Sequence, residues 1–342
     1  MYKRVLKLLI ILLLIFQSGF LTAQNAIHAF ENYNKGVSFF KIYEYDSAIY
    51  YFNEAVLLKP DLGRAYYNMA VSYYNQEEYV NSIKVINKYL EDNSTNKAYF
   101  LKARSFHLLN NIDSALYYYE KAIVAGKNLP EAYFYKGVIL YETGDYTASL
   151  LFFTEAIDID NKKGKYYYNR ALTYEKLEVY DKAIDDYLMA LEFFQDDVEI
   201  LSDLGYCYFK NNNSKDAIKY LRKALEVDPE YIPANNNLGL VYLGLNNYNE
   251  AISYFSLALS ISENNLILLN NRGITYYKME QFDKALKDLN YILSVNEKDK
   301  IAYFNRGNVK ENLLNLQGAC EDWNKALYYG VDENIIPLNL CK

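Results

Sequence analysis

The same sequence unit recurs along almost the whole chain, and residues 198–231 show it most clearly. In this unit Leu201 and Tyr208 belong to an apolar stripe at helical spacing, and a polar turn follows. A second apolar stripe begins at Ala217, and Pro229 ends the second helix. Two amphipathic helices joined by a short turn cannot bury both apolar faces alone. The unit must therefore stack against copies of itself, which predicts an all-α solenoid.

Nine copies of this unit follow one another in phase. The small residue of each first helix recurs at a constant interval, shorter by one only between the second and third copies, at Gly36, Ala70, Ala103, Gly137, Ala171, Gly205, Gly239, Gly273 and Gly307. The second helix opens on a small residue at Ala48, Ser82, Ala115, Ser149, Ala183, Ala217, Ala251, Ala285 and Ala319. Because no Pro-, Gly- or Ser-rich linker interrupts the array, we expect one continuous domain.

The pattern resembles the tetratricopeptide repeat (TPR) family, whose 34-residue helix–turn–helix carries an aromatic, Leu-Gly, Tyr, Ala, Phe and Pro at fixed offsets. The resemblance covers residues 29–333 and implies a right-handed α-solenoid, or superhelix, of nine repeats. The repeats are expected to begin at residues 29, 63, 96, 130, 164, 198, 232, 266 and 300. Residues 25–28 are then a short lead-in, and residues 334–342 a half-repeat that caps the C-terminal end of the stack.

The first residues of the chain have the pattern of a targeting segment. Three basic residues within 3–7 precede a continuous apolar run over 8–16, and residues 21–24 offer a cleavage site, so residues 1–24 are expected to be a secretory signal peptide. The alternative is an uncleaved anchor, because residues 5–21 are about long enough to span a bilayer. Both interpretations place the repeats in the periplasm or cell envelope of a bacterium.

The charge balance limits the class of partner. The chain has a formal net charge of −7, and removal of the signal peptide, which carries three positive and no negative charges, moves it to −10. Binding to nucleic acid or to anionic lipid surfaces needs clustered Lys and Arg, which an acidic solenoid does not offer. We therefore expect a protein or peptide partner, no nucleic acid, and membrane contact only through the signal or anchor segment.

The resemblance also implies where a partner binds, because the first helix of each TPR lines the concave surface. The sixth position of that helix is rich in amides and reads Asn34, Asn68, Leu101, Tyr135, Asn169, Asp203, Asn237, Asn271 and Asn305. In the similar repeats of the O-linked GlcNAc transferases an Asn column at this position grips the backbone of an extended peptide. A carboxamide suits this role because it offers one acceptor and two donors. The alternative is that Asn at this position serves helix packing or solubility.

Aromatic residues flank the amide column on the same helices. The residues expected to line the groove are Tyr67, Tyr74, Tyr141, Tyr168, Tyr206, Tyr277 and Phe304. Such rings give a protein partner contact area at low entropic cost. They equally suit stacking on sugar rings, so the alternative function is a carbohydrate- or cell-wall-associated binding module. A further alternative is that neighbouring repeats bury part of this stripe.

The last repeat and the tail resemble the ending of many exported bacterial TPR proteins. In those proteins a Gly-Ala-Cys-x-Asp-Trp stretch, here at residues 318–323, is followed about twenty residues later by a terminal Cys. The resemblance implies a disulfide between Cys320 and Cys341 that ties the cap down in an oxidising compartment. Two unpaired thiols that fill space in the packing are the alternative.

Signals of catalysis are missing from the sequence. His28 and His107 lie in different regions, and no metal-ligand cluster, Gly-rich phosphate loop or nucleophile motif accompanies them. We therefore predict a chain that is not an enzyme and has no catalytic residues, metal or cofactor. The function that the sequence predicts is an exported scaffold that binds a protein segment in its concave groove and helps to assemble a cell-envelope complex.

Overall fold

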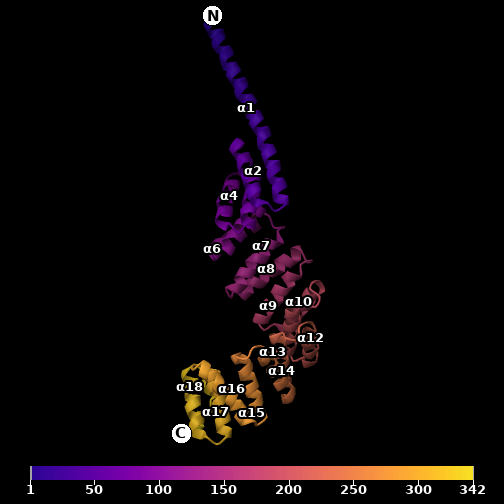
Figure 1. Cartoon of the computed structure of the whole chain (residues 1–342), viewed down its shortest axis with the longest axis vertical. Coiled ribbons are helices and arrows are strands. Elements are labelled where there is room, and N and C mark those ends of the chain that lie inside the picture. The colour runs from indigo at the N-terminus through magenta and orange to yellow at the C-terminus, as the bar shows by residue number, and fades with distance from the viewer. Residues whose placement is uncertain (1, 342) are drawn as a thin grey trace. The chain divides into compact units, whose positions relative to one another are not determined.

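The computed structural model describes the backbone of residues 2–341 and the side chains of residues 22–337 and 339–341. Within these residues the chain forms eighteen α-helices and two short 3₁₀-helices, and no strand (Figure 1). The predicted all-α fold is confirmed. The predicted signal peptide, residues 1–24, falls mainly on side chains that lie outside the described residues. Among the helices whose side chains are described, none is both long and apolar enough to cross a membrane.

The first compact unit ends at Lys162 and consists of four helical hairpins. Its helices are α1 (Tyr2–Lys41), α2 (Tyr45–Leu58), α3 (Gly63–Asn75), α4 (Tyr79–Asp92), α5 (Asn96–Leu108), α6 (Ile112–Ala125), α7 (Pro130–Glu142) and α8 (Tyr146–Ile159). Residues 25–28, expected to be a separate lead-in, are instead part of α1. The reason is local, because no proline interrupts the helical pattern between residues 22 and 41.

The second compact unit begins at Lys163 and consists of five hairpins. Its helices are α9 (Gly164–Lys176), α10 (Tyr180–Phe193), α11 (Val198–Lys210), α12 (Ser214–Val227), α13 (Ile232–Gly244), α14 (Tyr248–Ile261), α15 (Leu266–Lys278), α16 (Phe282–Val295), α17 (Lys300–Asn312) and α18 (Leu316–Tyr328). Two 3₁₀-helices follow, η1 (Glu333–Ile335) and η2 (Leu338–Cys341). Odd-numbered helices are the first helix of a repeat and even-numbered helices the second.

A left-handed residue reverses the chain between the two helices of each repeat. Gly144 has φ +85°, and the equivalent Asn212 and Leu314 each have φ +60°. This conformation suits glycine but costs other residues about 1–2 kcal/mol. The packing of the two helices offsets this cost, because the second helix starts within a few residues and packs antiparallel on the first.

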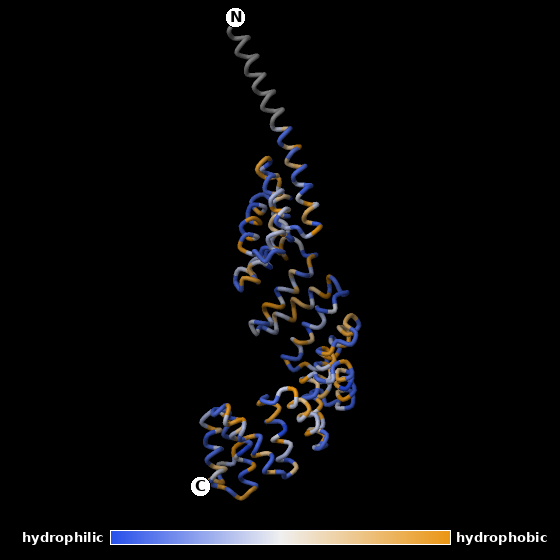
Figure 2. The backbone as a smooth tube through the Cα atoms, in the orientation of Figure 1, coloured by the Kyte–Doolittle hydropathy of each residue, from blue (hydrophilic) through white to orange (hydrophobic). Residues whose placement is uncertain are grey.

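Small residues meet large ones where the two helices of a hairpin cross. Ala48, Phe52 and Ala55 on α2 are fully buried, and Gly36 on α1 lies against the Phe52 ring. The second unit repeats this arrangement with Phe255 and Trp323. Apolar and polar stretches alternate along the described helices (Figure 2), so each helix buries one stripe and exposes the other.

Three repeats of the second unit replace an apolar contact by an ion pair. Arg170 binds Asp186 at 2.7 Å, and Arg272 and Arg306 bind Asp288 and Asp322 at the equivalent positions. All three carboxylates are buried, and each accepts hydrogen bonds from two guanidinium nitrogens. In the repeats that begin at residues 198 and 232 the same two positions hold leucine and tyrosine. Ionic and apolar pairs therefore occupy the same place in the stack.

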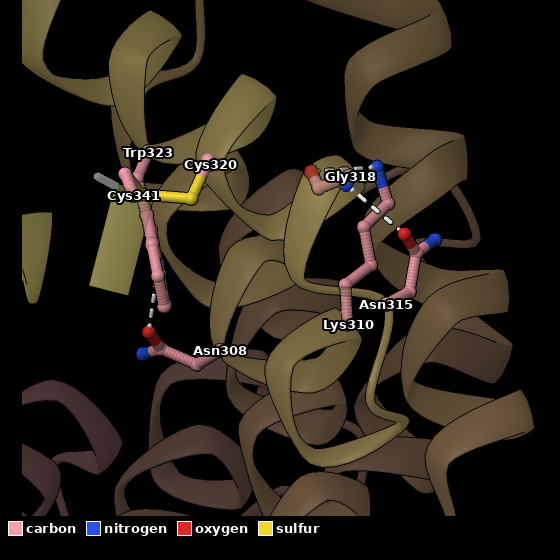
Figure 3. The surroundings of a disulfide bond; sticks show 7 residues. All are labelled: Asn308, Lys310, Asn315, Gly318, Cys320, Trp323 and Cys341. Carbon is pink, nitrogen blue, oxygen red and sulfur yellow. Dashed lines mark hydrogen bonds between the residues drawn. A yellow bond between two sulfur atoms is a disulfide. The ribbon is translucent and has the colours of Figure 1, made fainter.

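The C-terminal end of the second unit is closed by a disulfide. Cys320 of α18 is joined to Cys341 of η2, with the two Cα atoms 5.5 Å apart (Figure 3). Trp323 lies beside the bridge, and its Nε1 donates to Asn308 Oδ1 on α17 at 3.0 Å. The bridge and this hydrogen bond hold the tail and α18 against α17.

The tail itself differs from the expected half-repeat. Residues 334–342 were expected to begin a tenth repeat, but the described part forms the short η1 and η2 instead of an α-helix. Pro337 separates the two 3₁₀-helices, and its missing N–H and its ring disfavour an α-helix that continues through this position. Ile336 is nevertheless buried, so the tail covers apolar surface of the last repeat.

Loss of the disulfide is expected to weaken the last repeat. The bridge closes a loop with a sequence separation of 21 residues, for which cross-link stabilisation is about 3 kcal/mol. Cys341→Ser should therefore lower the free energy of unfolding by about that amount. Urea titration followed by the fluorescence of Trp323, the single tryptophan of the chain, measures it. Reductant should lower the urea midpoint of the unaltered chain to that of Cys341→Ser, and should not change the midpoint of Cys341→Ser. An unaltered chain whose midpoint is the same with and without reductant would contradict this role.

Candidate functional site

The first helices of neighbouring repeats are the elements that position the predicted site. In the second unit α11 contacts α13, α13 contacts α15 and α15 contacts α17, although each of these helices is separated in sequence by a second helix. Within the described part of this unit, the second helices make no contact of this extent with one another, so the first helices share a common side of the stack. The predicted site residues of this unit all lie on these helices or on α9.

Asparagine side chains join these helices in a regular diagonal. Asn271 Nδ2 donates to Asn236 Oδ1 at 2.9 Å, and Asn305 Nδ2 donates to Asn270 Oδ1 at 2.8 Å. A longer contact of 3.5 Å runs from Asn237 Nδ2 to a serine hydroxyl on α11. In these three contacts a sixth-position amide donates to the fifth-position residue of the preceding repeat. We call the half-buried set Asn236, Asn237, Asn270, Asn271 and Asn305 the amide face.

Sequence reasoning identified the sixth-position column but missed Asn236 and Asn270. The signal for them is the doubled asparagine at two successive repeats, residues 236–237 and 270–271. The packing alternative raised for the column applies to two of its members, because one N–H of Asn271 and of Asn305 donates to the neighbouring first helix. Among the described residues, their Oδ1 atoms and second N–H groups have no further hydrogen bond. The amides are held in place and still have capacity for a ligand.

The first unit repeats this diagonal once and does not extend it. Asn68 Nδ2 donates to the hydroxyl of Tyr33, the fifth-position residue of the preceding repeat, at 3.2 Å, and Asn34 is exposed. At the next two repeats the column holds Leu101, which is buried, and Tyr135, whose ring lies 3.7 Å from the Arg104 guanidinium carbon. The column of the first unit therefore has one such link, from α3 to α1, and the next two repeats offer no amide at the sixth position to continue it.

The predicted aromatic residues pack largely against their own repeats. In the first unit Tyr67 lies 5.5 Å from Tyr89 between ring centroids, and Tyr74 and Tyr141 make similar contacts with Tyr79 and Tyr146. In the second unit Tyr168 lies 6.0 Å from Tyr187, and Tyr277 lies 6.2 Å from Phe282. These site residues, with Tyr206 and Phe304, are half-buried. Each ring thus exposes only part of its surface.

Asp203 is the acidic exception in the amide column. Burial raises the pKa of Asp203 to about 8, and the negative charges of Glu175, Glu199 and Asp197 raise it as well. The positive charge of Lys176 has the opposite effect on this pKa. At neutral pH this carboxyl therefore keeps its proton. A protonated carboxyl both donates and accepts a hydrogen bond, so Asp203 resembles the asparagines of its column. The preceding column member, Asn169, instead donates to its own backbone at Lys165 O, 2.8 Å away.

Two of the predicted residues meet at a small hollow. Tyr277 on α15 and Asn305 on α17 line a cavity of about 150 Å³, together with Ile274, Asn308 and Val309. It lies next to the amide face, because Asn305 belongs to both. The described side chains contain no group of three or more His, Cys, Asp or Glu residues that could hold a metal ion.

Comparisons with known proteins agree with this architecture. Tetratricopeptide repeat models match residues 198–231 and 230–298, and a model of subunit 3 of the anaphase-promoting complex, or cyclosome, matches residues 108–190. A TPR repeat-containing protein of Methanocaldococcus jannaschii is 26% identical over 217 residues, which cover 61% of this chain and 38% of that protein. The chain thus spans well under half of the length of the curated relatives it matches.

Solved structures show the same fold at low sequence identity. A tetratricopeptide repeat protein from Parabacteroides merdae superposes with a TM-score of 0.61 and 23% identity, over 72% of this chain and 97% of that chain. The Cut9–Hcn1 hetero-tetramer of the anaphase-promoting complex gives a TM-score of 0.56 and 16% identity, over 91% of this chain and 75% of that chain. With the matched repeat models, these likenesses identify the fold of this chain as an α-solenoid of tetratricopeptide repeats.

Proposed function

We propose that the chain is a non-catalytic scaffold whose amide face binds an extended segment of a partner protein. Solenoids of tetratricopeptide repeats typically serve as protein–protein interaction scaffolds and are generally non-catalytic. The observation that carries the proposal is the linked amides on α13, α15 and α17. Asn271 and Asn305 are fixed by one hydrogen bond each and keep a carbonyl oxygen and a second N–H for a ligand.

The spacing of the helices suits an extended peptide. Packed helices lie about 8–10 Å apart, and an extended chain advances about 3.3 Å per residue. Amides on successive first helices therefore meet about every third peptide unit. Because a carboxamide can both donate to and accept from a peptide unit, such a row holds backbone without reading side chains.

Export and a role in assembling a cell-envelope complex are part of the same proposal. They are supported by the basic and apolar start of the chain and by the Cys320–Cys341 disulfide, which suits an oxidising compartment. Fractionation of the native cells, with mass spectrometry of the N-terminus, tests this part. A protein found outside the cytoplasm without residues 1–24 is the expected result, and an intact cytoplasmic protein would contradict it.

Replacing three sixth-position amides is expected to weaken peptide binding. A random dodecapeptide library displayed on phage is selected on the immobilised chain, and the affinity of enriched peptides is measured for Asn237→Ala/Asn271→Ala/Asn305→Ala. Three lost amide contacts, each contributing about 1 kcal/mol, should weaken binding by at least about tenfold. The double variant Asn249→Ala/Asn324→Ala, which removes exposed asparagines from α14 and α18, should bind normally.

The stability of the triple variant needs its own measurement, because its three amides also donate to the preceding first helix. Circular dichroism and Trp323 fluorescence should show a folded chain with a modest loss of stability. A library that yields no enriched peptide, or a folded triple variant that binds as the unaltered chain does, would rule out the amide face as the binding surface.

A further inference from the structure

One glycine contact of the second unit is looser than its equivalents in the other repeats. A Cβ atom added at Gly36, Gly137, Gly205, Gly239 or Gly307 would come within 2.4–2.9 Å of the large side chain on the second helix. At Gly273 the nearest atom, Leu289 Cγ, is 3.4 Å away. The first and second helices of this repeat therefore leave space between them that the other repeats fill.

The space opens as the hollow between α15 and α17. Leu289, Ile274 and Val309 give the hollow an apolar lining, and Tyr277 lines it as well. The volume of about 150 Å³ matches that of an engineered apolar cavity that stays dry and binds benzene. A single apolar side chain is therefore the size of group that the hollow accepts.

The polar atoms at the rim are oriented by their neighbours. The Trp323 indole donates to Asn308 Oδ1, and because an indole N–H can only donate, the Asn308 Nδ2 group is left as a donor. Asn305 Nδ2 donates to Asn270, which leaves Asn305 Oδ1 as an acceptor. A fixed donor and a fixed acceptor beside an apolar hollow match one residue of a peptide, with its backbone on the rim and its side chain inside.

We propose that this hollow is the specificity pocket of the bound segment and takes a leucine-, isoleucine-, methionine- or phenylalanine-type side chain. This inference rests on the proposed peptide binding and adds a side-chain preference to it. Basic side chains are disfavoured, because Lys278 lines the same hollow and the apolar side chains there cannot compensate for their lost hydration. The amides hold backbone of any sequence, whereas the hollow selects one position.

The variant Leu289→Phe tests the pocket with a residue that other repeats of this chain have at the equivalent position. Phe52, Phe153 and Phe255 occupy the equivalent position beside a glycine in other repeats, so the fold accommodates this residue. The ring should fill the hollow, and Leu289→Met, which conserves volume, should leave it open. Loss of one buried apolar side chain should weaken peptides selected on the unaltered chain roughly 10- to 100-fold in Leu289→Phe.

A second measurement separates the pocket from peptide binding as a whole. The methyl groups of Ile274 and Val309 are followed by NMR while N-acetyl-L-leucinamide or N-acetylglycinamide is added to the full chain. The leucine probe should shift both methyl groups of the unaltered chain and of Leu289→Met, and neither shift should appear with the glycine probe or in Leu289→Phe.

The two proposals fail in different ways. If selected peptides lack a fixed apolar position, or bind a folded Leu289→Phe chain as tightly as before, the pocket inference is wrong while amide-dependent binding stands. If the leucine probe binds but no peptide depends on the sixth-position amides, the proposed function fails instead. Equal shifts in Leu289→Phe and the unaltered chain would also overturn the pocket.

Discussion

Asp322→Ala is expected to lower the free energy of unfolding of the C-terminal repeats by about 3–5 kcal/mol. Removing one partner of a buried ion pair leaves the other charge buried, with neither water nor an opposite charge to stabilise it. Asp322 is 2% exposed and receives Arg306 Nη2 at 2.7 Å, Arg306 Nε at 2.8 Å and Lys310 Nζ at 2.8 Å. Removing the carboxylate leaves these two cations without their partner in a largely buried site.

The adjacent Trp323 makes this loss measurable in one repeat. Its fluorescence reports on α18 directly, which matters because repeats of a solenoid need not unfold together. Glu321→Ala, an exposed neighbour on the same helix, should change the unfolding free energy by less than about 0.5 kcal/mol. A loss for Asp322→Ala no larger than that of this control would contradict the assigned role of the pair.

The chain also provides a rescue for this variant. In the repeat that begins at residue 232 the positions of Arg306, Lys310 and Asp322 are held by Leu238, Tyr242 and Tyr254. Arg306→Leu/Lys310→Tyr/Asp322→Tyr should therefore recover most of the stability, because apolar groups often replace buried ion pairs without loss. A triple variant as unstable as Asp322→Ala would show that the repeats do not exchange these groups.

Asp203→Asn is expected to stabilise the chain by an amount that grows with pH. The folded pKa of Asp203 is raised to about 8, from an ordinary value of 3.8, by burial and by Glu175, Glu199 and Asp197. Between about pH 4 and pH 8 the folded chain therefore holds a proton that the unfolded chain releases. The unaltered chain loses roughly 1.4 kcal/mol of stability per pH unit in this window, and the asparagine variant has no such loss at this site.

Thermal unfolding of both chains by circular dichroism at pH 5, 6, 7 and 8 tests this sign. The difference between them should widen with pH and level off above about pH 8, whereas Glu226→Gln, at an exposed site on α12, should show no such trend. A constant difference, or one that narrows as pH rises, would contradict a protonated Asp203. Peptide binding at neutral pH should be nearly unchanged, since asparagine and a protonated carboxyl both donate and accept.

The repeat period predicts the hairpins well because it is set by residues within one repeat. The expected starts at residues 63, 164 and 300 coincide with the first residues of α3, α9 and α17. Hydrogen bonds between repeats are harder to predict. Asn236 and Asn271 are separated by one position more than the repeat period, because the fifth position of one helix meets the sixth position of the next. This pairing depends on how far neighbouring first helices are shifted relative to one another, and the repeat period does not give that shift.

The sequence could have predicted the Arg–Asp pairs but not the hollow. The Arg–Asp pairs recur at one fixed spacing in three repeats, so a comparison of columns could have found them. The hollow could not be found in this way, because Gly205 and Gly273 both face a leucine and differ only in how closely it approaches, 2.5 against 3.4 Å. Differences of that size arise from backbone packing.

Site-specific photo-crosslinking tests the central claim most directly, since it reports where a bound segment lies. A benzophenone amino acid is placed at Leu240, on the first helix α13 next to the amide face, or at the exposed Ser253 on the second helix α14. The chain is then irradiated with a peptide selected from the library. Adducts should form from position 240 and not from position 253; adducts that form equally from both, or from position 253 alone, would contradict binding on the first-helix face.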